Sequence, residues 1–479
     1  MRSKSLMNRR ASRRDVLKNS AAAGAAAGAA AGMGRGNASA AHQAASPAAT
    51  PAAPPVAQNT NVSGDLVEWG FGVAETNPLA RSRVEAFQAA YPNVSLQIVE
   101  SFDEQKLLTA AASETLPDVI WLSRFETATW AARGVLQPLT EFIERDAYDT
   151  SNFYEAALNE ATFEDDLYGI PGGMDVRMLF VNVDHLTDAG IDPATIDTSN
   201  WEQLNEFGAK LVQTEGNNAT RWGFDHKIQQ GNIWLWGRGN GGSFIDEDGT
   251  EATFNNEKVV EALDLGVQGY DAQGGFQAYE ALATTFQGDE QFPRGQVSMT
   301  IYEQWMMSGP LVTVAPDMNF AVFPVREHGS GPDGQMTSFT GGNAWYITSG
   351  AKNPDAAWEF IKFLHTDDTW RLGALAVKEA RQAEDRPYFP SLTGSMTADK
   401  LQIDEIYEPI GETFDATVAL LPDLLAVSEN REIANSPVAG QLDDIMQNEG
   451  VEPALRGQGS AQEVLDAANE SAQDAIDSF

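Results

Sequence analysis

Short apolar strands alternate with amphipathic helices at the start of the folded region, and this alternation limits the chain to few folds. The predicted order is strand 65–71, helix 77–91, strand 94–99, helix 102–113 and strand 117–122. Strands joined through helices at this spacing lie parallel in one sheet. We therefore expect an α/β fold, with ligands meeting the carboxyl ends of the strands around Trp69 to Phe71 and Trp121 to Arg124.

Composition excludes several classes of protein. The chain has 479 residues, 42% of them hydrophobic, so it can bury a large core and form two or three domains. It has no cysteine, which excludes disulfides, thiolate metal sites and a lipid-modified cysteine anchor. The formal net charge of -38 opposes binding to nucleic acid or to an anionic bilayer.

The basic residues gather at the N-terminus, in the pattern of an export signal. Arg13 and Arg14 precede an Ala/Gly-rich stretch at 21–34 and a small-x-small site at 38–40. This order is typical of a twin-arginine signal peptide, which we expect to span residues 1–40, and a disordered tail is the alternative. Residues 41–64, rich in Ala, Pro, Gln and Asn, are predicted to be a disordered linker. We expect export to the periplasm or the cell surface.

Motifs for catalysis and for cofactors are incomplete. Residues 237–242 fit G-x-G-x-x-G, but an acidic turn follows them where a dinucleotide site needs a helix. That turn, residues 246–249, lacks the later ligands of a calcium loop. No two of the five histidines stand four residues apart, and no G-x-S-x-G elbow occurs. We expect no enzyme activity, no metal and no cofactor.

Aromatic residues stand where strands or apolar runs end. They are Trp69, Phe71, Trp121, Trp234, Trp236, Tyr302, Trp305 and Trp345. Flat rings suit the apolar C–H faces of sugars, and neighbouring polar groups bond the hydroxyls. For each residue taken alone, filling the core is an equal alternative. Their shared position at strand ends favours a binding site.

Six segments, in consistent order, resemble one family. They are residues 117–121, 134–139, 168–171 with 179–184, 292–299 with Trp305, 341–345 and 353–364. They look like the extracellular solute-binding proteins of ABC importers, in the group that includes the maltose-binding protein. The resemblance runs from about Asp65 to the C-terminus.

The resemblance implies a type II periplasmic-binding-protein-like fold. In that fold, two α/β lobes are joined by hinge crossovers and hold the ligand in the cleft between them. By motif position, lobe 1 takes residues 65–171 and 339–385, and lobe 2 takes residues 172–338 and 386–479.

The resemblance also carries over individual site residues. Trp121 falls on a sugar-stacking position, Asp175 on a hydroxyl-binding acid, and Trp234 and Trp305 on stacking aromatics of the second lobe. Arg124 stands where the relative has an acid, which leaves the identity of the ligand open. The full set of expected ligand-binding residues is Trp69, Phe71, Trp121, Ser123, Arg124, Asp175, Arg177, Trp234, Trp236, Tyr302, Glu303, Trp305, Gly342, Asn343 and Trp345.

The expected function is capture of a small solute, most simply a carbohydrate, and its delivery to an ABC transporter permease by a monomeric receptor. A binder of another solute is the main alternative. A polyamine would suit Asp175 and Glu303, whereas glycerol phosphate or an acidic sugar would need Arg124 and Arg177 to point inward. A peptide is a further alternative, and a secreted carbohydrate-active enzyme would need a pair of carboxylates at a fixed separation.

Overall fold

The computed structural model describes residues 58–216 and 218–479. The expected signal peptide at residues 1–40, and the linker as far as residue 57, lie outside the described residues. The end of the linker is placed: the Asn59 backbone N–H donates to Glu359 Oε2 (3.0 Å), and Gly64 begins the first strand. In the described part of the chain, no helix combines the length and apolarity needed to cross a membrane.

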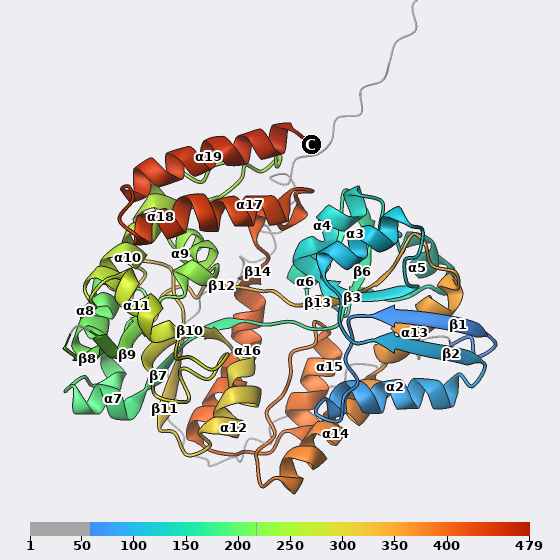
Figure 1. Ribbon diagram of the computed structural model, residues 1–479. Coiled ribbons are helices and arrows are strands. Elements are labelled where there is room, and N and C mark those ends of the chain that lie inside the picture. The colour runs from blue at the N-terminus through green and yellow to red at the C-terminus, as the bar shows by residue number, and fades with distance from the viewer. Residues whose placement is uncertain (1–57, 217) are drawn as a thin grey trace, which may run out of the picture. The chain divides into compact units, whose positions relative to one another are not determined.

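The first sheet has five strands in the order β2-β1-β3-β13-β6 (Figure 1). These strands are β1 (Gly64–Trp69), β2 (Val94–Val99), β3 (Val119–Ser123), β6 (Gly169–Pro171) and β13 (Asn343–Ile347). Strand β1 pairs in parallel with β2 and β3, whereas β13 runs antiparallel to β3 and β6. The predicted strand–helix alternation and parallel pairing are confirmed.

Local capping explains where the two connecting helices of this sheet begin. Asn77 Oδ1 accepts from the Ala80 amide (3.2 Å) at the start of α2 (Pro78–Ala90). Asp103 Oδ1 accepts from the Lys106 amide (2.7 Å) at the start of α3 (Glu104–Ala112). The further elements of this part are α4 (Thr127–Ala132), α5 (Thr140–Asp146), α6 (Glu155–Glu160), β4 (Thr162–Phe163), β5 (Asp166–Leu167), α13 (Pro354–Leu364) and α14 (Asp367–Ala383). The next helix, α15 (Met396–Leu401), packs on α14.

The second sheet has five strands in the order β11-β7-β10-β9-β8. They are β7 (Arg177–Asn182), β8 (Gln213–Glu215), β9 (Asn218–Asp225), β10 (Val297–Glu303) and β11 (Phe320–Pro324). Strand β10 runs parallel to β9 and antiparallel to β7, and every residue of β7 is buried. The carboxyl ends of β9 and β10 therefore lie at one edge of this sheet.

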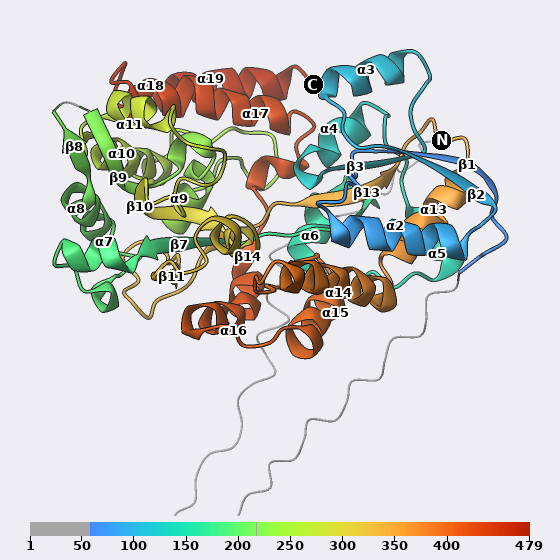
Figure 2. The same cartoon turned by 60° about the horizontal axis from the view of Figure 1, so that its bottom comes forward.

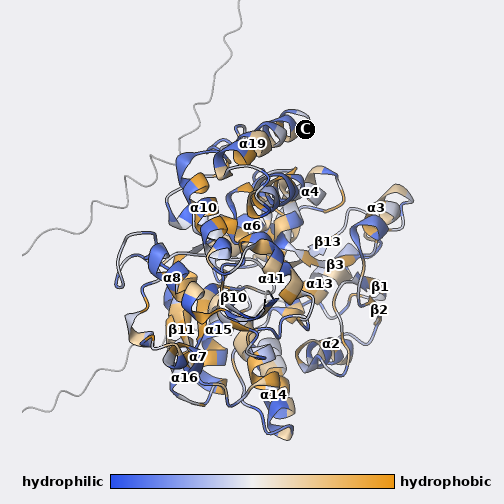
Figure 3. Cartoon of the chain, turned by 60° about the vertical axis from the view of Figure 1, so that its left-hand side comes forward, coloured by the Kyte–Doolittle hydropathy of each residue, from blue (hydrophilic) through white to orange (hydrophobic). Residues whose placement is uncertain are grey.

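Helices cover the second sheet and extend to the C-terminus. They are α7 (Val183–Asp188), α8 (Trp201–Leu211), α9 (Ile233–Gly239), α10 (Glu257–Asp271), α11 (Phe276–Ala283), α12 (Val312–Val314), α16 (Glu412–Val427), α17 (Ala439–Ile445), α18 (Glu452–Leu455) and α19 (Ala461–Asp477). Figure 1 shows α17 to α19 together beside α10, and the turned view of Figure 2 brings α14 to α16 forward. Helices α10, α14 and α19 carry both hydrophobic and hydrophilic parts (Figure 3), which is typical of helices with one face on a core.

The chain passes between the two sheets at residues 172–176 and again at residues 340–342, after β12 (Ser338–Phe339), which pairs with β14 (Ser428–Glu429). The two crossovers touch. Gly342 has φ +130°, and a Cβ there would lie 2.2 Å from the Gly173 carbonyl oxygen. Only glycine allows this approach.

Candidate functional site

A cavity of about 400 Å³ lies where the first three strands end at their carboxyl edge. Its lining residues come from the segments that follow β1, β2 and β3 and from the start of β13. They are Gly70, Glu100, Ser101, Phe102, Glu104, Trp121, Leu122, Ser123, Glu126, Trp130 and Asn343. The cavity is thus at the edge where an α/β sheet binds ligands.

A tight loop after β1 forms one wall of this cavity. Gly70 has φ +106°, and a Cβ there would lie 2.5 Å from the Trp121 carbonyl oxygen, so the loop approaches β3 as closely as glycine allows. The Phe71 ring stands edge-on to Trp121 (5.4 Å between centroids) and to Trp345 (4.6 Å). The three rings pack together, and Trp121, which is half-buried, also lines the cavity.

The lining of the cavity is also acidic, with Glu100, Glu104 and Glu126. Glu126 Oε2 accepts a hydrogen bond from Trp130 Nε1 (2.8 Å). Burial raises the pKa of Glu126, the bond from Trp130 lowers it, and the nearby Glu104 raises it. Glu104 itself pairs with the exposed Arg133 at 3.4 Å. Indole surface beside carboxylates, Ser123 and Asn343 offers both an apolar face and hydrogen-bonding groups for a polyhydroxylated ligand.

Arg124 lies next to this cavity but is bonded to the crossovers. Its guanidinium is fully buried and pairs with the equally buried Glu160 through Nε (3.1 Å). Nη1 donates to the Gly173 carbonyl and to Asn343 O (3.3 Å), and Nη2 donates to Gly341 O (2.6 Å). One side chain therefore ties both crossovers to the end of β3.

Asp175 and Arg177 continue this network on the second sheet. Asp175 Oδ1 accepts from the Gly341 amide (2.7 Å) and pairs with Arg177. Arg177 Nη2 also lies 3.1 Å from Glu303 Oε1, and its guanidinium stacks on Phe339 at 3.7 Å. The side chains of Asp175 and Glu303 keep 17% and 21% of their surface exposed, although both carboxylates are paired with Arg177.

Comparison with known proteins places this arrangement in a family. A family model described as "Bacterial extracellular solute-binding protein" matches residues 82–409. The chain belongs to this family. The lactose-binding protein of Rhizobium radiobacter is 22% identical to this solute-binding protein over 319 residues, which cover 64% of this chain and 71% of that protein. The diacetylchitobiose binding protein DasA of Streptomyces coelicolor is 26% identical over 343 residues, covering 68% and 72%.

Solved structures show the same fold. An ABC substrate-binding protein from Listeria monocytogenes, in complex with cycloalternan, superposes with a TM-score of 0.69 at 18% identity, covering 87% of this chain and 99% of that one. The expected membership of the extracellular solute-binding proteins and the two-lobe α/β fold are therefore confirmed, and these relatives are binding proteins.

The structure brings some of the expected site residues of the solute-binding protein to the cavity and places others in the core. Trp121, Ser123 and Asn343 line the cavity, and Phe71 and Trp345 pack behind Trp121. Trp345 is fully buried. Gly342 has its structural role at the contact between the crossovers. Ligand contact by each of these residues stays a prediction.

Trp234 and Trp236 fill the core of the second sheet. They are 2% and 1% exposed. Trp234 Nε1 donates to Asp443 Oδ1 (2.7 Å) and Trp236 Nε1 to His226 O (3.1 Å). Because both indoles are covered and bonded, neither offers a face to a ligand in this conformation.

Tyr302, Glu303 and Trp305 stand at the carboxyl end of β10. The Tyr302 hydroxyl donates to Asp289, and burial raises its pKa. Its ring stands edge-on to Trp305 at 5.0 Å, and Trp305 is half-buried. Of these, Glu303 and Trp305 present accessible surface.

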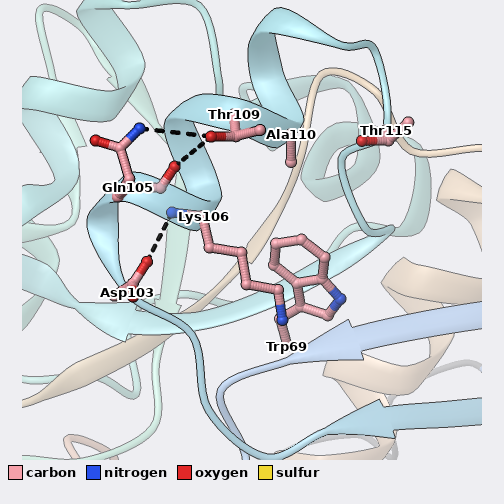
Figure 4. A pocket seen from close by; sticks show the side chains of 7 residues that line it. All are labelled: Trp69, Asp103, Gln105, Lys106, Thr109, Ala110 and Thr115. Carbon is pink, nitrogen blue, oxygen red and sulfur yellow. Dashed lines mark hydrogen bonds between the residues drawn. The ribbon is translucent and has the colours of Figure 1, made fainter.

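Trp69 is the last residue of β1, directly before the Gly70 loop. It lines a separate cavity of about 370 Å³ with Asp103, Gln105, Lys106, Thr109, Ala110 and Thr115 (Figure 4). Lys106 Nζ stands 4.2 Å from the centre of its ring, a cation–π contact that covers one face. Trp69 and Trp121 thus line different cavities.

Sequence reasoning missed the acids Glu100, Glu104 and Glu126, and also Trp130. A signal existed for Glu100, which directly follows the predicted strand 94–99, just as Trp121 to Arg124 end the next one. Glu126 and Trp130 stand four residues apart on the turn and helix after β3, and only the fold shows that they face the cavity.

Proposed function

We propose that this protein binds a carbohydrate in the cavity at the carboxyl edge of the first sheet. The observation that carries the proposal is the combination found there: the half-buried indole of Trp121 beside carboxylates, Ser123 and Asn343 in about 400 Å³. Hydroxyl groups would donate to the carboxylates while a sugar ring packs on the indole. Relatives named for lactose and for diacetylchitobiose support this class of ligand.

Capture would proceed by closure of two lobes, residues 65–171 with 339–385 and residues 172–338 with 386–479. The glycine pairs at 172–173 and 341–342 give the crossovers backbone freedom, and Asp175, Glu303 and Trp305 would complete the site from the second sheet. A ligand that contacts both lobes favours the closed state by its higher affinity for it. No covalent step is involved.

The closed protein would deliver its ligand, as a monomer, to the permease of an ABC transporter. Arg13 and Arg14, followed by the small-residue stretch, support export by the twin-arginine route and a position in the periplasm or at the cell surface.

A direct test is the binding of lactose, diacetylchitobiose and mannotriose to the mature protein, followed by calorimetry and tryptophan fluorescence, with product analysis for turnover. We expect saturable binding without product, and Trp121→Ala to weaken it about tenfold or more, because a stacked indole is lost. Trp69→Ala is the matched control, since that indole lines the other cavity. Equal effects of the two variants, or turnover, would refute the proposal.

A cationic solute is the second candidate. Glu100, Glu104 and Glu126 line the cavity, and Arg133, the partner of Glu104, does not line it. An anionic ligand is disfavoured, because Arg124 and Arg177 are already paired with carboxylates. Binding of spermidine with no response to the saccharides would move the assignment to this class.

A further inference from the structure

An acidic side chain is buried in the first sheet directly below the loop that forms one wall of the cavity. Glu68, on β1, is fully buried, and its strand neighbours are Ile98 and Val119. Glu68 Oε1 accepts from the Phe71 backbone N–H (3.1 Å), whereas Oε2 has no hydrogen-bond partner among the described residues. A lone carboxyl in an apolar sheet is costly, so its retention needs a reason.

The bond from Phe71 sets the position of the loop. Between the two residues, Gly70 adopts a left-handed conformation and approaches the Trp121 carbonyl. The Phe71 ring then packs edge-on against Trp121 and Trp345. Gly70 and Trp121 both line the cavity, so a shift of the Phe71 amide would displace two of its lining residues.

We propose that Glu68 is a positioning residue for ligand binding: its buried carboxyl fixes the loop after β1 and thereby the Trp121 indole. The ligand-binding part of this inference rests on the proposed function.

The surroundings of Glu68 keep it protonated. Burial raises its pKa to about 9, against a smaller lowering by the Phe71 amide. Strands β2 and β3 carry no charged residue. Asp118, before β3, accepts from the amides of Val67, Lys352 and Asn353. On α13, Glu359 pairs with Lys362 (2.6 Å). On α3, Lys106 covers Trp69.

Ionisation of Glu68 would bring water to the carboxylate and loosen the loop, because a bare charge cannot remain in this site. Wild-type affinity is therefore expected to fall as the pH rises through about 9. The neutral isostere in Glu68→Gln keeps an acceptor for Phe71 and cannot ionise, whereas Glu68→Leu removes the acceptor.

The experiment uses three readouts on the full mature protein. Hydrogen exchange of the Phe71 amide at pH 7 and near-ultraviolet circular dichroism from pH 7 to 10 need no ligand. The third is affinity for whichever of lactose, diacetylchitobiose and mannotriose binds best. We expect Glu68→Leu to speed exchange and weaken binding about tenfold each, the effect of one lost hydrogen bond. Glu68→Gln should match wild type at pH 7.

Above pH 9 the wild type should lose the part of its aromatic dichroism that comes from the packed rings of Phe71, Trp121 and Trp345. It should also lose its affinity, while Glu68→Gln should keep both. Identical pH profiles of the two proteins, or unchanged exchange in Glu68→Leu, would overturn the inference. If Glu68→Leu does not fold, the comparison of the pH profiles of wild type and Glu68→Gln still tests the inference. If no saccharide binds, the proposed function fails, and exchange and dichroism still test the position of the loop.

Discussion

Replacing Arg124 with methionine tests the contact between the two crossovers most directly. The guanidinium is fully buried, pairs with Glu160, and donates to carbonyls on both crossovers. Methionine has a similar length and fits the apolar part of the site, but it donates no hydrogen bond. The substitution therefore removes the charge and the donors while changing the packing little.

The expected loss of stability follows from the buried groups that lose Arg124 as a partner. Removing one partner of a buried ion pair costs about 3–5 kcal/mol, because the other charge stays buried. Glu160 is that charge, and burial already raises its pKa. In the variant, the Gly341 carbonyl still accepts a hydrogen bond from Thr340 Oγ1. The Asn343 carbonyl still accepts hydrogen bonds from the backbone amides of Gly172 and Gly173. The Gly173 carbonyl loses its donor, so part of the cost, about 1–3 kcal/mol, is independent of Glu160.

Urea unfolding followed by tryptophan fluorescence, at pH 7 and at fixed salt, measures the change. We expect Arg124→Met to lower the free energy of unfolding by about 3–5 kcal/mol, and by less as the pH falls and the unpaired, buried Glu160 is protonated. Adding Glu160→Gln to Arg124→Met should recover all but about 1–3 kcal/mol. The control is Arg133→Met, whose 44%-exposed side chain pairs with Glu104 at 3.4 Å and should contribute at most about 1 kcal/mol.

A loss no larger than that of Arg133→Met would refute this account of Arg124. So would a double variant as unstable as Arg124→Met alone, because the cost then would not come from the unpaired Glu160.

Three further outcomes are expected. Gly70→Ala should weaken saccharide binding more than tenfold in calorimetry, because its Cβ would lie 2.5 Å from the Trp121 carbonyl at a positive φ; normal affinity would contradict the tight loop. Burial lowers the pKa of His226 to about 3, whereas the unfolded chain protonates it at about 6.5, so this histidine alone should lower the free energy of unfolding by about 1.4 kcal/mol per pH unit below that value. The pH slope should be smaller by that amount in His226→Gln, and an unchanged slope would contradict the neutral state of His226. Trp234→Leu should lower the urea midpoint without changing saccharide affinity, since the Trp234 indole is 2% exposed and hydrogen-bonded to Asp443. If a stably folded Trp234→Leu variant loses affinity, Trp234 contacts the ligand after all.

The sequence determined the local elements of the first sheet. Alternating apolar residues at 94–99 made a strand, and Asn77 and Asp103 capped the helices predicted beside it. These features depend on neighbours within a few residues, so they can be read along the chain. The family resemblance was equally a property of ordered local motifs.

Tertiary structure decided which of the candidate residues face the cavity. Trp121 and Trp234 looked alike in sequence, since both end an apolar run, yet one lines the cavity and the other fills the second core. Arg124 stood at a strand end, where a ligand contact was expected, and its partners Glu160 and Gly341 come from 36 and 217 residues away. Burial and pairing depend on such distant segments, which no local pattern specifies. The sequence could therefore locate the edge of the sheet, but only the folded chain shows which side chains remain free there.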